Sequence, residues 1–349
     1  MSGVQLLTIE ADEADQRIDR WLRRRYPHLA QGRIERMCRK GELRLDGGRV
    51  KSSSRVMAGQ TVRVPPIPDE AEPVAYVPKA KISADDVKMI QSCVIYRDDH
   101  IVVLNKPAGL PSQGGSKQTR HVDMLSEALK FGFEEKPRLV HRLDKDTSGV
   151  LLLARTRAAA QAFTAAFRHR ETRKIYWAIV AGVPHPGMAS VKYGLKKATG
   201  HGARGEGERM ICVHPDEVRF DDDAKRAHTD YAVLSRLASR AAWTALTPVT
   251  GRTHQLRAHM AEIGHPIVGD GKYGGSSQEN FGDGWGAQLG GDISKKLHLH
   301  ARSLNLLHPM TGAQLTLTAP LPDHMERTWQ TFGWSASDVP ANPFDGDEF

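Results

Sequence analysis

Apolar residues near the start of the chain recur at the spacing of an amphipathic helix in two places. In residues 16–26 and again in residues 31–40 they fall on one helical face, and arginines fill the opposite face. The inward positions are Ile18, Trp21, Leu22, Ile34, Met37 and Cys38. Gly41 follows the second stretch, where glycine commonly ends a helix. The pattern predicts two short helices, each with a basic outer face.

A small β-ribbon is expected directly after these helices. Residues 43–50 and 61–64 read as short strands, and Asp46-Gly47 is a pair typical of tight hairpin turns. The sequence therefore predicts a small unit of two helices and a ribbon at the start of the chain.

From residue 94 onward, short strands are mixed with helices. Strands are expected at 94–96 and 101–104, which form a hairpin, and at 149–154, 174–182 and 230–236. Helices are expected at 158–167 and at 254–263, the second with Thr253 as N-cap and Gly264 just past its end. Because strand and helix do not alternate regularly, we expect an α+β fold rather than a doubly wound sheet.

Proline and glycine mark the boundaries of the expected domains. Residues 65–80 hold five prolines among several acidic residues, as expected of a semi-rigid linker. The predicted organisation is a small domain at 14–66, a linker at 67–92, a large domain at 93–330 and a flexible acidic tail at 335–349. Two glycine-rich segments, 194–209 and 274–291, are expected to be long loops.

Composition excludes several classes of protein. A chain of 349 residues is long enough for two domains, and no apolar run approaches the roughly 18 residues of a membrane span. The first residues contain acids where a signal peptide needs a basic flank. Cys38, Cys93 and Cys212 lie far apart, which argues against a disulfide framework or a zinc knuckle. We expect a cytoplasmic protein without a membrane partner.

The positive charge is concentrated at one end of the chain. Residues 16–64 hold 14 lysines and arginines against 4 aspartates and glutamates, while the whole chain carries a net charge of +8. Such a concentration is typical of a module that binds a polyanion. The candidate contacts are Arg20, Arg24, Arg33, Arg36, Arg39 and Lys40. The alternative is that these side chains only solvate two helix surfaces.

A polar turn between apolar flanks is the first candidate for chemistry. Residues 141–149, His-Arg-Leu-Asp-Lys-Asp-Thr-Ser-Gly, would hold an exposed side chain on a rigid base. The alternative is a capped turn in which Asp146 or Thr147 satisfies backbone donors.

Two further segments carry functional candidates. Tyr176, in the expected strand 174–178, faces either a cleft or the core. Arg257 lies in the first turn of the helix that follows a Gly-Arg-Thr turn at 251–253. It pairs with a phosphate or a carboxylate, or it is solvated.

Taken together, these segments resemble the RluA family of pseudouridine synthases. The matching stretches are LNKPAGL, HRLDKDTSG, KIYWA, GRTHQLRAHMAEIGHPIVGD, LHLHARSL with the HP that follows, and APLP, all within residues 94–325. The resemblance implies a mixed, largely antiparallel sheet in the large domain. Residues 14–66 similarly resemble an S4 RNA-binding domain, which usually precedes such a catalytic domain in this family.

The resemblance also implies roles for single residues. Asp144 matches the nucleophilic aspartate, and Tyr176 matches the tyrosine that stacks on the flipped base. Arg257 matches the basic residue that pairs with the aspartate, and we expect this pair to lower the pKa of Asp144. The expected RNA contacts in this domain are His141, Arg142, Arg252 and His254.

The implied reaction isomerises uridine to pseudouridine in RNA. It breaks the N1–C1′ bond, rotates the freed uracil and joins C5 to C1′, so it is redox-neutral and needs neither a cofactor nor a metal. A stacked uridine must first be flipped out of the RNA. The resemblance points to a monomer acting on 23S ribosomal RNA, although related enzymes act on tRNA or on both. The atom that Asp144 attacks stays open.

Three other hypotheses are weaker. A metal site could use His254, His259, His265, His298 and His300, but their spacing matches no metal motif such as HExxH. A methyltransferase with an S4 domain would need a glycine-rich cofactor loop after a strand, and none stands out. GGSK at 114–117 lacks the spacing of a nucleotide-binding P-loop. A non-catalytic RNA-binding assembly factor is disfavoured because Asp144, Tyr176 and Arg257 are all present.

Overall fold

The computed structural model describes residues 3–67, 82–114, 119–168, 171–198, 209–274 and 293–344. The chain divides into two compact units, Met1–Ala80 and Lys81–Phe349, which are treated separately below.

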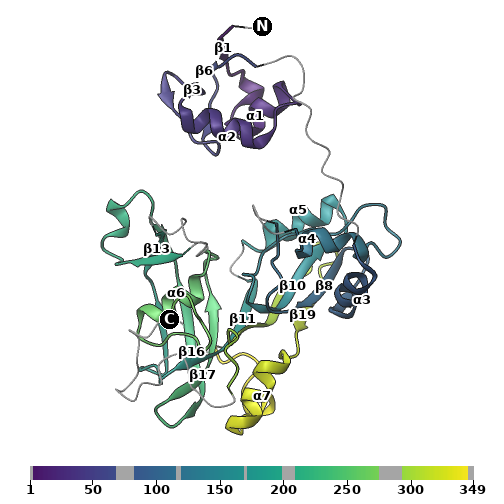
Figure 1. Cartoon of the computed structure of the whole chain (residues 1–349), viewed down its shortest axis with the longest axis vertical. Coiled ribbons are helices and arrows are strands. Elements are labelled where there is room, and N and C mark those ends of the chain that lie inside the picture. Colours follow the sequence, from purple (N-terminus) through teal and green to yellow (C-terminus); the bar gives the residue numbers. More distant parts are fainter. Residues whose placement is uncertain are drawn as a thin grey trace. The chain divides into compact units, whose positions relative to one another are not determined.

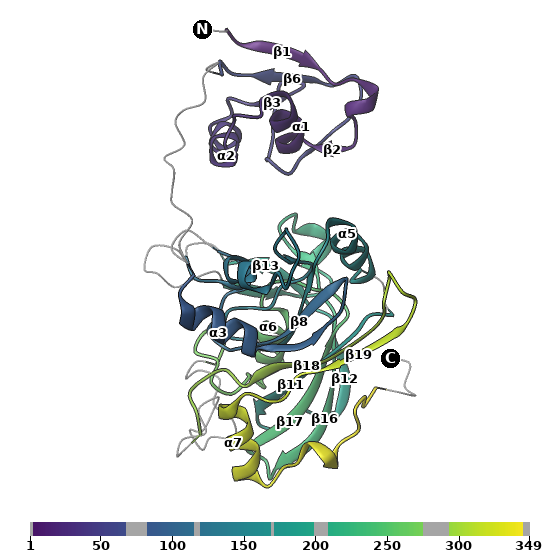
Figure 2. The same cartoon turned by 90° about the vertical axis from the view of Figure 1, so that its right-hand side faces the viewer.

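The N-terminal unit packs two helices against a small sheet. The helices are α1 (Ile18–Arg25) and α2 (Gln31–Lys40), and the four-stranded sheet has the order β1 (Gln5–Thr8), β6 (Thr61–Val64), β3 (Arg44–Leu45), β4 (Gly48–Arg49). A short 3-10 helix, η1 (Ala11–Glu13), precedes β2 (Gln16–Arg17), which pairs with β5 (Arg55–Val56). Both helices lie on one side of the sheet (Figure 2).

The amphipathic pattern of this unit is confirmed in the structure. Each apolar position assigned to the inner helical faces is buried in a single core with Val62 and Val64 of the sheet. Gly41 adopts the left-handed conformation that ends α2, and Asp46 and Gly47 have the positive φ angles of a tight hairpin turn.

The large unit is built on one long sheet. Its main path runs β12 (Met188–Val191), β16 (Thr229–Leu237), β17 (Ala241–Pro248), β11 (Arg173–Ala181), β18 (Leu299–Leu307), β10 (Ser148–Ala154), β8 (Ile101–Lys106), β7 (Val94–Arg97). Two strands lie off this path: β19 (Gln314–Thr318) pairs with β18 and β9 (Arg138–Leu139) with β10. Among the strands that the structure describes in this sheet, the β10–β18 pairing alone is parallel, which confirms the predicted α+β fold with a mixed, largely antiparallel sheet.

Helices cover both faces of this sheet. The helices of the large unit are α3 (Ala84–Ser92), α4 (Val122–Leu125), α5 (Arg157–Ala166), α6 (Gln255–Glu262) and α7 (Asp323–Phe332), with the 3-10 turns η2 (Ser126–Leu129) and η4 (Ala336–Asp338). Leu256 of α6 packs with Leu246 on one face, and Trp329 of α7 packs with Trp243 on the other (Figure 1). Within the described ranges, none of the helices combines the length and apolar character of a membrane span.

A second, three-stranded sheet lies next to α6. Its order is β14 (Met210–Val213), β13 (Gly194–Lys197), β15 (Lys225–Arg226), with the 3-10 turn η3 (Val218–Phe220) between β14 and β15. The prediction of a loop over 194–209 is therefore wrong for 194–197, because Leu195 packs against Ala258 of α6 as part of a small core. Residues 199–208 lie outside the described residues, as do all but the first residue of the predicted loop 274–291.

The boundaries predicted for the linker and the tail also need correction. Part of the predicted linker 67–92 is α3, whose Ile90 is fully buried in the core of the large unit, and residues 68–81 lie outside the described ranges. Part of the predicted flexible tail 335–349 is packed, because Phe344 is buried against the sheet. Residues 345–349 lie outside the described ranges. Isolated apolar residues in polar stretches anchor both segments.

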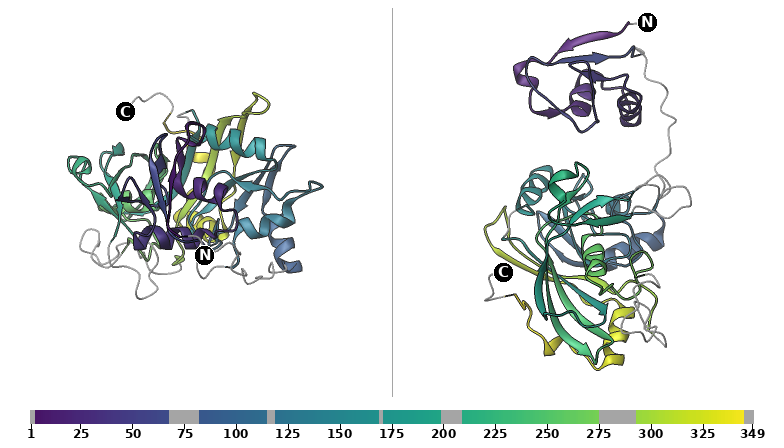
Figure 3. Two further views of the ribbon diagram at one scale, coloured as in Figure 1. Left: turned by 90° about the horizontal axis from the view of Figure 1, so that it is seen from above. Right: turned by 90° about the vertical axis from the view of Figure 1, so that its left-hand side faces the viewer.

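Strand β18 changes its neighbour at one point, and this change positions the polar turn. It pairs with β10 only at Ser148 and Gly149, and β19 pairs with it beyond Ser303. Gly149 has a φ of 110°, and a Cβ atom there would lie 2.2 Å from the carbonyl oxygen of Ala301. Only glycine permits this approach, so the end of the turn is fixed directly against β18. The long neighbouring strands β16 and β17 are the green strands in the right-hand view of Figure 3.

Candidate active site

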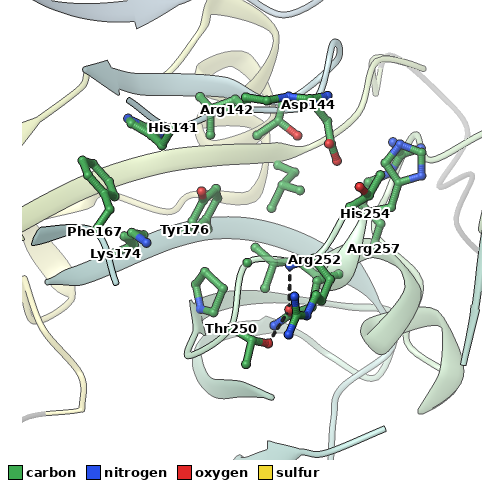
Figure 4. A pocket seen from close by; sticks show the side chains of 18 of the residues that line it. His141, Arg142, Asp144, Phe167, Lys174, Tyr176, Thr250, Arg252, His254 and Arg257 are labelled. Carbon is green, nitrogen blue, oxygen red and sulfur yellow. Dashed lines mark hydrogen bonds between the residues drawn. The ribbon is translucent and has the colours of Figure 1, made fainter. Parts of the chain in front are cut away.

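A cavity of about 580 Å3 opens where three distant segments meet. The turn that follows β9 contributes Asp144, strand β11 contributes Tyr176, and the start of α6 contributes Arg257. Figure 4 shows Asp144 and Arg257 toward one end of the cavity, Phe167 and Lys174 toward the other, and Tyr176 between them. The structure thus brings together the three residues expected to act in catalysis.

The turn that carries Asp144 is braced on both sides by the loop that follows β8. Before Asp144, the Ser112 hydroxyl donates to the carbonyl of Leu143 (2.7 Å) and accepts from its N–H (3.1 Å). After it, the carbonyl of Lys145 accepts from the N–H of Gly109 (2.9 Å) and from Lys106 Nζ (3.0 Å). The sequence reasoning did not identify this bracing, because a buried serine or lysine has no distinctive spacing.

Lys106 is fully buried behind this turn. Its ammonium group donates to three backbone carbonyls, those of Pro107 (2.9 Å), Leu110 (2.8 Å) and Lys145 (3.0 Å). Burial lowers the pKa of Lys106 to about 7, although the charges of Asp146 and Asp144 oppose the change.

The charge on Asp144 depends on opposing effects. Burial raises the pKa of Asp144, while the positive charges of Arg257, Arg142 and Lys106 lower it; the net direction is upward. The prediction of a lowered pKa is therefore wrong, because a residue's burial cannot be read from the spacing of a motif. An elevated pKa leaves Asp144 a more basic and more nucleophilic carboxylate than a solvated one.

Arg257 makes its closest ion pair with a residue that the sequence analysis did not consider. Its Nε and Nη2 donate to the two carboxylate oxygens of Asp270 at 2.7 and 2.8 Å, and both side chains are almost completely buried. The expected close pair of Arg257 with Asp144 is thus replaced by a pair with Asp270. Arg257 still acts on Asp144 through its charge, which is the largest effect opposing the burial of that carboxyl.

Asp270 is held in place by the turn after α6. Gly269 has a φ of 75°, and a Cβ atom there would lie 2.0 Å from the carbonyl oxygen of Lys296. Asp270 Oδ1 also accepts from the backbone N–H groups of Lys272 (3.0 Å) and Tyr273 (3.1 Å). The glycine and these hydrogen bonds fix the carboxylate that orients Arg257.

Helix α6 begins differently from the prediction. The N-cap is His254, with a φ of 52°, rather than Thr253. Gln255 organises this start: its Oε1 accepts from Thr250 Oγ1 (2.6 Å) and from the N–H of Arg252 (3.1 Å). The expected Thr253 cap is therefore wrong: among the described residues no side chain caps α6, and Gln255 instead ties its start to the preceding turn.

The far end of the cavity is lined by aromatic and basic side chains. His141 stacks on Phe167 with ring centroids 4.4 Å apart, and its Nε2 accepts from the N–H of Leu152 at 2.9 Å. Burial lowers the pKa of His141 to about 3, so the ring is neutral. Lys174 Nζ lies 4.8 Å from the centre of the Phe167 ring. Burial, and then the charge of Asp144, raises the pKa of Tyr176 and keeps its hydroxyl protonated.

The other expected RNA contacts of the large unit also line the cavity. Arg142 and Arg252 are exposed at its rim, and Arg252 Nε donates to the carbonyl of Arg226 (3.2 Å). His254 contacts the hydroxyl of Tyr273 (3.0 Å), and burial together with the charges of Arg257 and Lys272 lowers its pKa to about 4.

The basic candidates of the N-terminal unit lie mainly on its surface. Arg20, Arg24, Arg36, Arg39 and Lys40 are exposed, whereas Arg33 is partly buried. Lys40 Nζ lies 3.8 Å from a carboxylate oxygen of Glu42. These residues belong to α1 and α2, as the sequence predicted.

The histidines considered as metal ligands have structural partners. Among the described residues, no group of three histidine, cysteine, aspartate or glutamate side chains could hold a metal ion. His300 Nδ1 lies 2.8 Å from the Ser148 hydroxyl and its Nε2 lies 3.2 Å from the carbonyl of Ala319. Burial lowers the pKa of His300 to about 3, so this pair ties the base of the polar turn to β18 without a charge.

Comparison with known proteins defines the class of enzyme. Residues 100–262 match the family model described as RNA pseudouridylate synthase. The solved structure of human RNA Pseudouridylate Synthase Domain Containing 4 superposes with a TM-score of 0.55 at 29% identity, covering 71% of this chain and 95% of that chain.

Curated relatives cover nearly the whole chain. The ribosomal large subunit pseudouridine synthase C of Vibrio cholerae is 35% identical over 93% of this chain and 95% of its own length. The protein of the same name from Escherichia coli (strain K12) is 36% identical, covering 94% of this chain and 96% of its own length. The chain belongs to the RNA pseudouridylate synthase family, and its activity is the isomerisation of uridine to pseudouridine in RNA.

Proposed function

We propose that the substrate is a uridine in the RNA of the large ribosomal subunit and that Asp144 is the nucleophile. The observation that carries the second part is the cavity shared by Asp144, Tyr176 and Arg257. The first part rests on relatives that are named large-subunit synthases and match this chain over nearly its whole length.

The reaction needs a carboxylate held beside a flipped nucleotide. Its net change is that the N1–C1′ bond breaks, C5 bonds to C1′, and the proton lost from C5 is balanced by one gained at N1. A carboxylate can add covalently to the substrate, which divides a difficult isomerisation into easier steps. The cavity of about 580 Å3 falls in the range of sites that enclose a small ligand, and base flipping delivers the uridine to it.

The other residues of the cavity prepare Asp144 and the base. Arg257, fixed by Asp270, supplies a positive charge that opposes the rise in the pKa of Asp144 caused by its burial. Tyr176 offers an aromatic face to the uracil, and its protonated hydroxyl is available to donate a hydrogen bond. Ser112 and Lys106 hold the backbone on either side of the nucleophile.

The N-terminal unit is proposed to act as an S4-type RNA-binding domain. Its exposed arginines on α1 and α2 suit the phosphate backbone. One copy of the chain suffices for the proposed reaction, because the three catalytic candidates come from a single chain. The curated relatives are bacterial, and a bacterial ribosome is modified in the cytoplasm, where we propose that this enzyme acts.

The test combines mapping with a matched pair of variants. Chemical mapping of ribosomal RNA from cells that lack the protein should show specific pseudouridines missing, and the wild-type gene should restore them. Asp144→Asn should restore none, because an amide cannot act as the nucleophile, while its RNA affinity should stay within about twofold because many phosphate contacts share the binding. Asp146→Asn, an exposed neighbour in the same turn, should restore them. Restoration by Asp144→Asn but not by Asp146→Asn would transfer the role to Asp146.

A further inference from the structure

A second cavity, of about 320 Å3, adjoins the catalytic cavity. The two share Phe167, Lys174 and Pro248 in their walls. The second cavity therefore begins at the end of the catalytic cavity that lies away from Asp144 and Arg257 (Figure 4).

The second cavity exists because two neighbouring strands separate. Strands β11 and β17 pair from Tyr176 and Leu246 onward, while residues 173–175 pair only with β18 and Thr247–Pro248 pair only with β16. Pro248 has no N–H with which to continue the ladder. The resulting gap is lined by Phe167 and Arg168, which directly follow α5, and by Asn342 and Phe344 near the end of the described chain.

The lining of the second cavity favours an anion. Among the described residues that line it are the cations Arg168, Arg173 and Lys174 and one carboxylate, Asp230. The Asp230 carboxylate is already engaged, because it accepts from the Ser190 hydroxyl at 2.5 Å and lies 2.9 Å from His228 Nε2. Its side chain is largely buried, with 16% exposed. The described lining therefore carries more positive than negative charge.

We propose that this second cavity binds the nucleotide next to the target uridine in the same RNA strand, with its phosphate on Arg168, Arg173 and Lys174. This proposal rests on the proposed placement of the uridine beside Asp144 and Tyr176. Three observations support it: the continuity of the two cavities, the positive lining, and the aromatic ring of Phe167 where they meet. A volume above about 300 Å3 is ordinary for a site that encloses a small ligand, and neighbouring nucleotides are joined by one phosphate.

The first experiment measures KM and kcat on an RNA mixture, so the modified uridine need not be known in advance. Tritium release from uridine labelled at C5 is followed in total RNA from cells that lack the protein, since this RNA contains the substrate of whichever class. The double variant Arg168→Gln/Arg173→Gln should raise KM about fivefold to twentyfold and change kcat less than about twofold, because phosphate contacts contribute to ground state and transition state alike. The slope of log KM against log salt should fall by about 1.4, because each of the two arginines that pair with phosphate contributes about 0.7 to it.

A matched control removes an arginine of the same unit from outside the cavity. Arg236 is exposed near the other end of β16, so Arg236→Gln should leave KM and the salt slope at their wild-type values. Equal salt slopes for the double variant and the wild type would overturn the proposal. Failure of the proposed function would look different, because Asp144→Asn would then stay active.

The second experiment locates the nucleotide. A short RNA around a mapped uridine is made with the phosphate on one side of that uridine replaced by a neutral methylphosphonate, and then with the other side replaced. On one side of the uridine only, the methylphosphonate should weaken RNA binding by the wild-type protein about fivefold. It should weaken binding by the double variant less than twofold, because this variant already lacks the arginines that recognise the phosphate. If the double variant and the methylphosphonate instead weaken binding independently on both sides of the uridine, their fold-changes in affinity multiply. In that case the second cavity does not bind a neighbouring phosphate.

The same measurements test whether a segment of this chain, rather than RNA, occupies the second cavity. Residues 345–349, which include Asp345, Asp347 and Glu348, follow Phe344 of the cavity wall. Removal of these five residues should leave KM unchanged if the cavity serves RNA. A fall in KM of threefold or more in the wild type, absent from the double variant, would show that the acidic end of the chain occupies the cavity instead.

Discussion

Asp144 and Asp270 share the influence of one arginine. Both hydrogen-bonding edges that Arg257 uses, Nε and Nη2, point to Asp270, and its charge reaches Asp144 as well. Asp144 is a half-buried carboxyl whose pKa is affected by a cation that another residue holds in place. Removal of the Arg257 charge should therefore change the pKa of Asp144. It should also leave Asp270 buried without its ion-pair partner.

The variant Arg257→Met should therefore change the pH dependence of activity and the stability together. In the proposed mechanism Asp144 acts as the carboxylate. Loss of the positive charge should raise the pKa of Asp144 further, so the acidic limb of the activity profile should move to higher pH. Leaving Asp270 buried without its partner should lower the free energy of unfolding by about 3–5 kcal/mol. Rate–pH profiles and urea unfolding test both expectations.

The double variant Arg257→Met/Asp270→Asn separates the two effects. It leaves no unpaired charge at this position, so most of the stability should return while activity stays low. Normal rates with an unshifted acidic limb in Arg257→Met would show that the arginine and Asp144 are electrostatically independent.

The sequence predicted which residues line the site better than it predicted the contacts that these residues make. Asp144, Tyr176 and Arg257 do line one cavity, as their motifs predicted. Asp270 was not proposed, although it lies in the matching stretch that ends in Gly269-Asp270. Which of two carboxylates an arginine contacts, and how deeply each is buried, depends on packing between segments that local sequence does not describe.

At the scale of elements, the loop after β8 determines where the catalytic turn lies. Ser112 is buried and bonds both backbone groups of Leu143. Ser112→Ala should leave those groups unsatisfied, at a cost of about 1–3 kcal/mol, and should lower kcat at least about tenfold with KM nearly unchanged, because RNA contacts are not altered. Steady-state kinetics together with urea unfolding test this.

A second buried serine provides the control for that variant. Ser126 donates to the carbonyl of Asp123, away from the nucleophile. Ser126→Ala should lower stability, though less than Ser112→Ala because Lys136 still donates to that carbonyl, and should leave kcat unchanged. Parallel losses of kcat in both variants would mean that Ser112 contributes to stability alone.

Gly149 is the second element-scale determinant, because it allows β10 to reach β18. Gly149→Ala should cost about 3 kcal/mol, from backbone strain at a φ of 110° and from the clash with Ala301. Gly312 also has a positive φ, 73°, but has open space around it, so Gly312→Ala should show only the strain, about 1 kcal/mol. Comparable unfolding midpoints for the two variants would contradict a close contact of β10 and β18.

Elements with strong periodicity were predictable, and those that depend on distant partners were not. Helices α1, α2 and α5 follow from their amphipathic spacing, and α6 was expected between Thr253 and Gly264 but is buried on nearly all sides. Strand β13 was expected to be a loop because its segment is rich in glycine, yet its pairing with β14 and β15 makes it a strand. Helix α3 lies within residues 67–92, which were assigned to the linker, and it is held by burial of Ile90.

At the scale of the whole molecule, the order of strands in the sheet lay beyond the sequence analysis. Strand β18 pairs with β10, about 150 residues earlier, and with β11 on its other edge. Such pairings bring the motif at 141–149 beside that at 251–259. Charge and composition, by contrast, are additive along the chain, so the separation of a basic N-terminal unit from a larger one could be anticipated near residue 80.

Deletion of residues 1–80 should weaken RNA binding and reduce its salt dependence while the remaining unit still folds. The large unit has its own buried cores, and the catalytic cavity draws no residue from the deleted part. The surplus of positive charge lies in residues 16–64. Loss of even four phosphate contacts should reduce the slope of log K against log salt by about three.

The consequence for activity depends on the substrate. A short RNA should still be modified by the truncated protein, because all the residues that line the cavity remain. Full-length ribosomal RNA at physiological salt should be modified much more slowly, and lowering the salt should restore much of the rate, since weaker screening favours the remaining basic residues. A charge-reduced full-length variant, Arg20→Gln/Arg24→Gln/Arg36→Gln/Arg39→Gln, should reproduce the loss without removing a domain. If the truncated protein, this variant and the wild type share one salt slope, the N-terminal unit does not bind the RNA backbone.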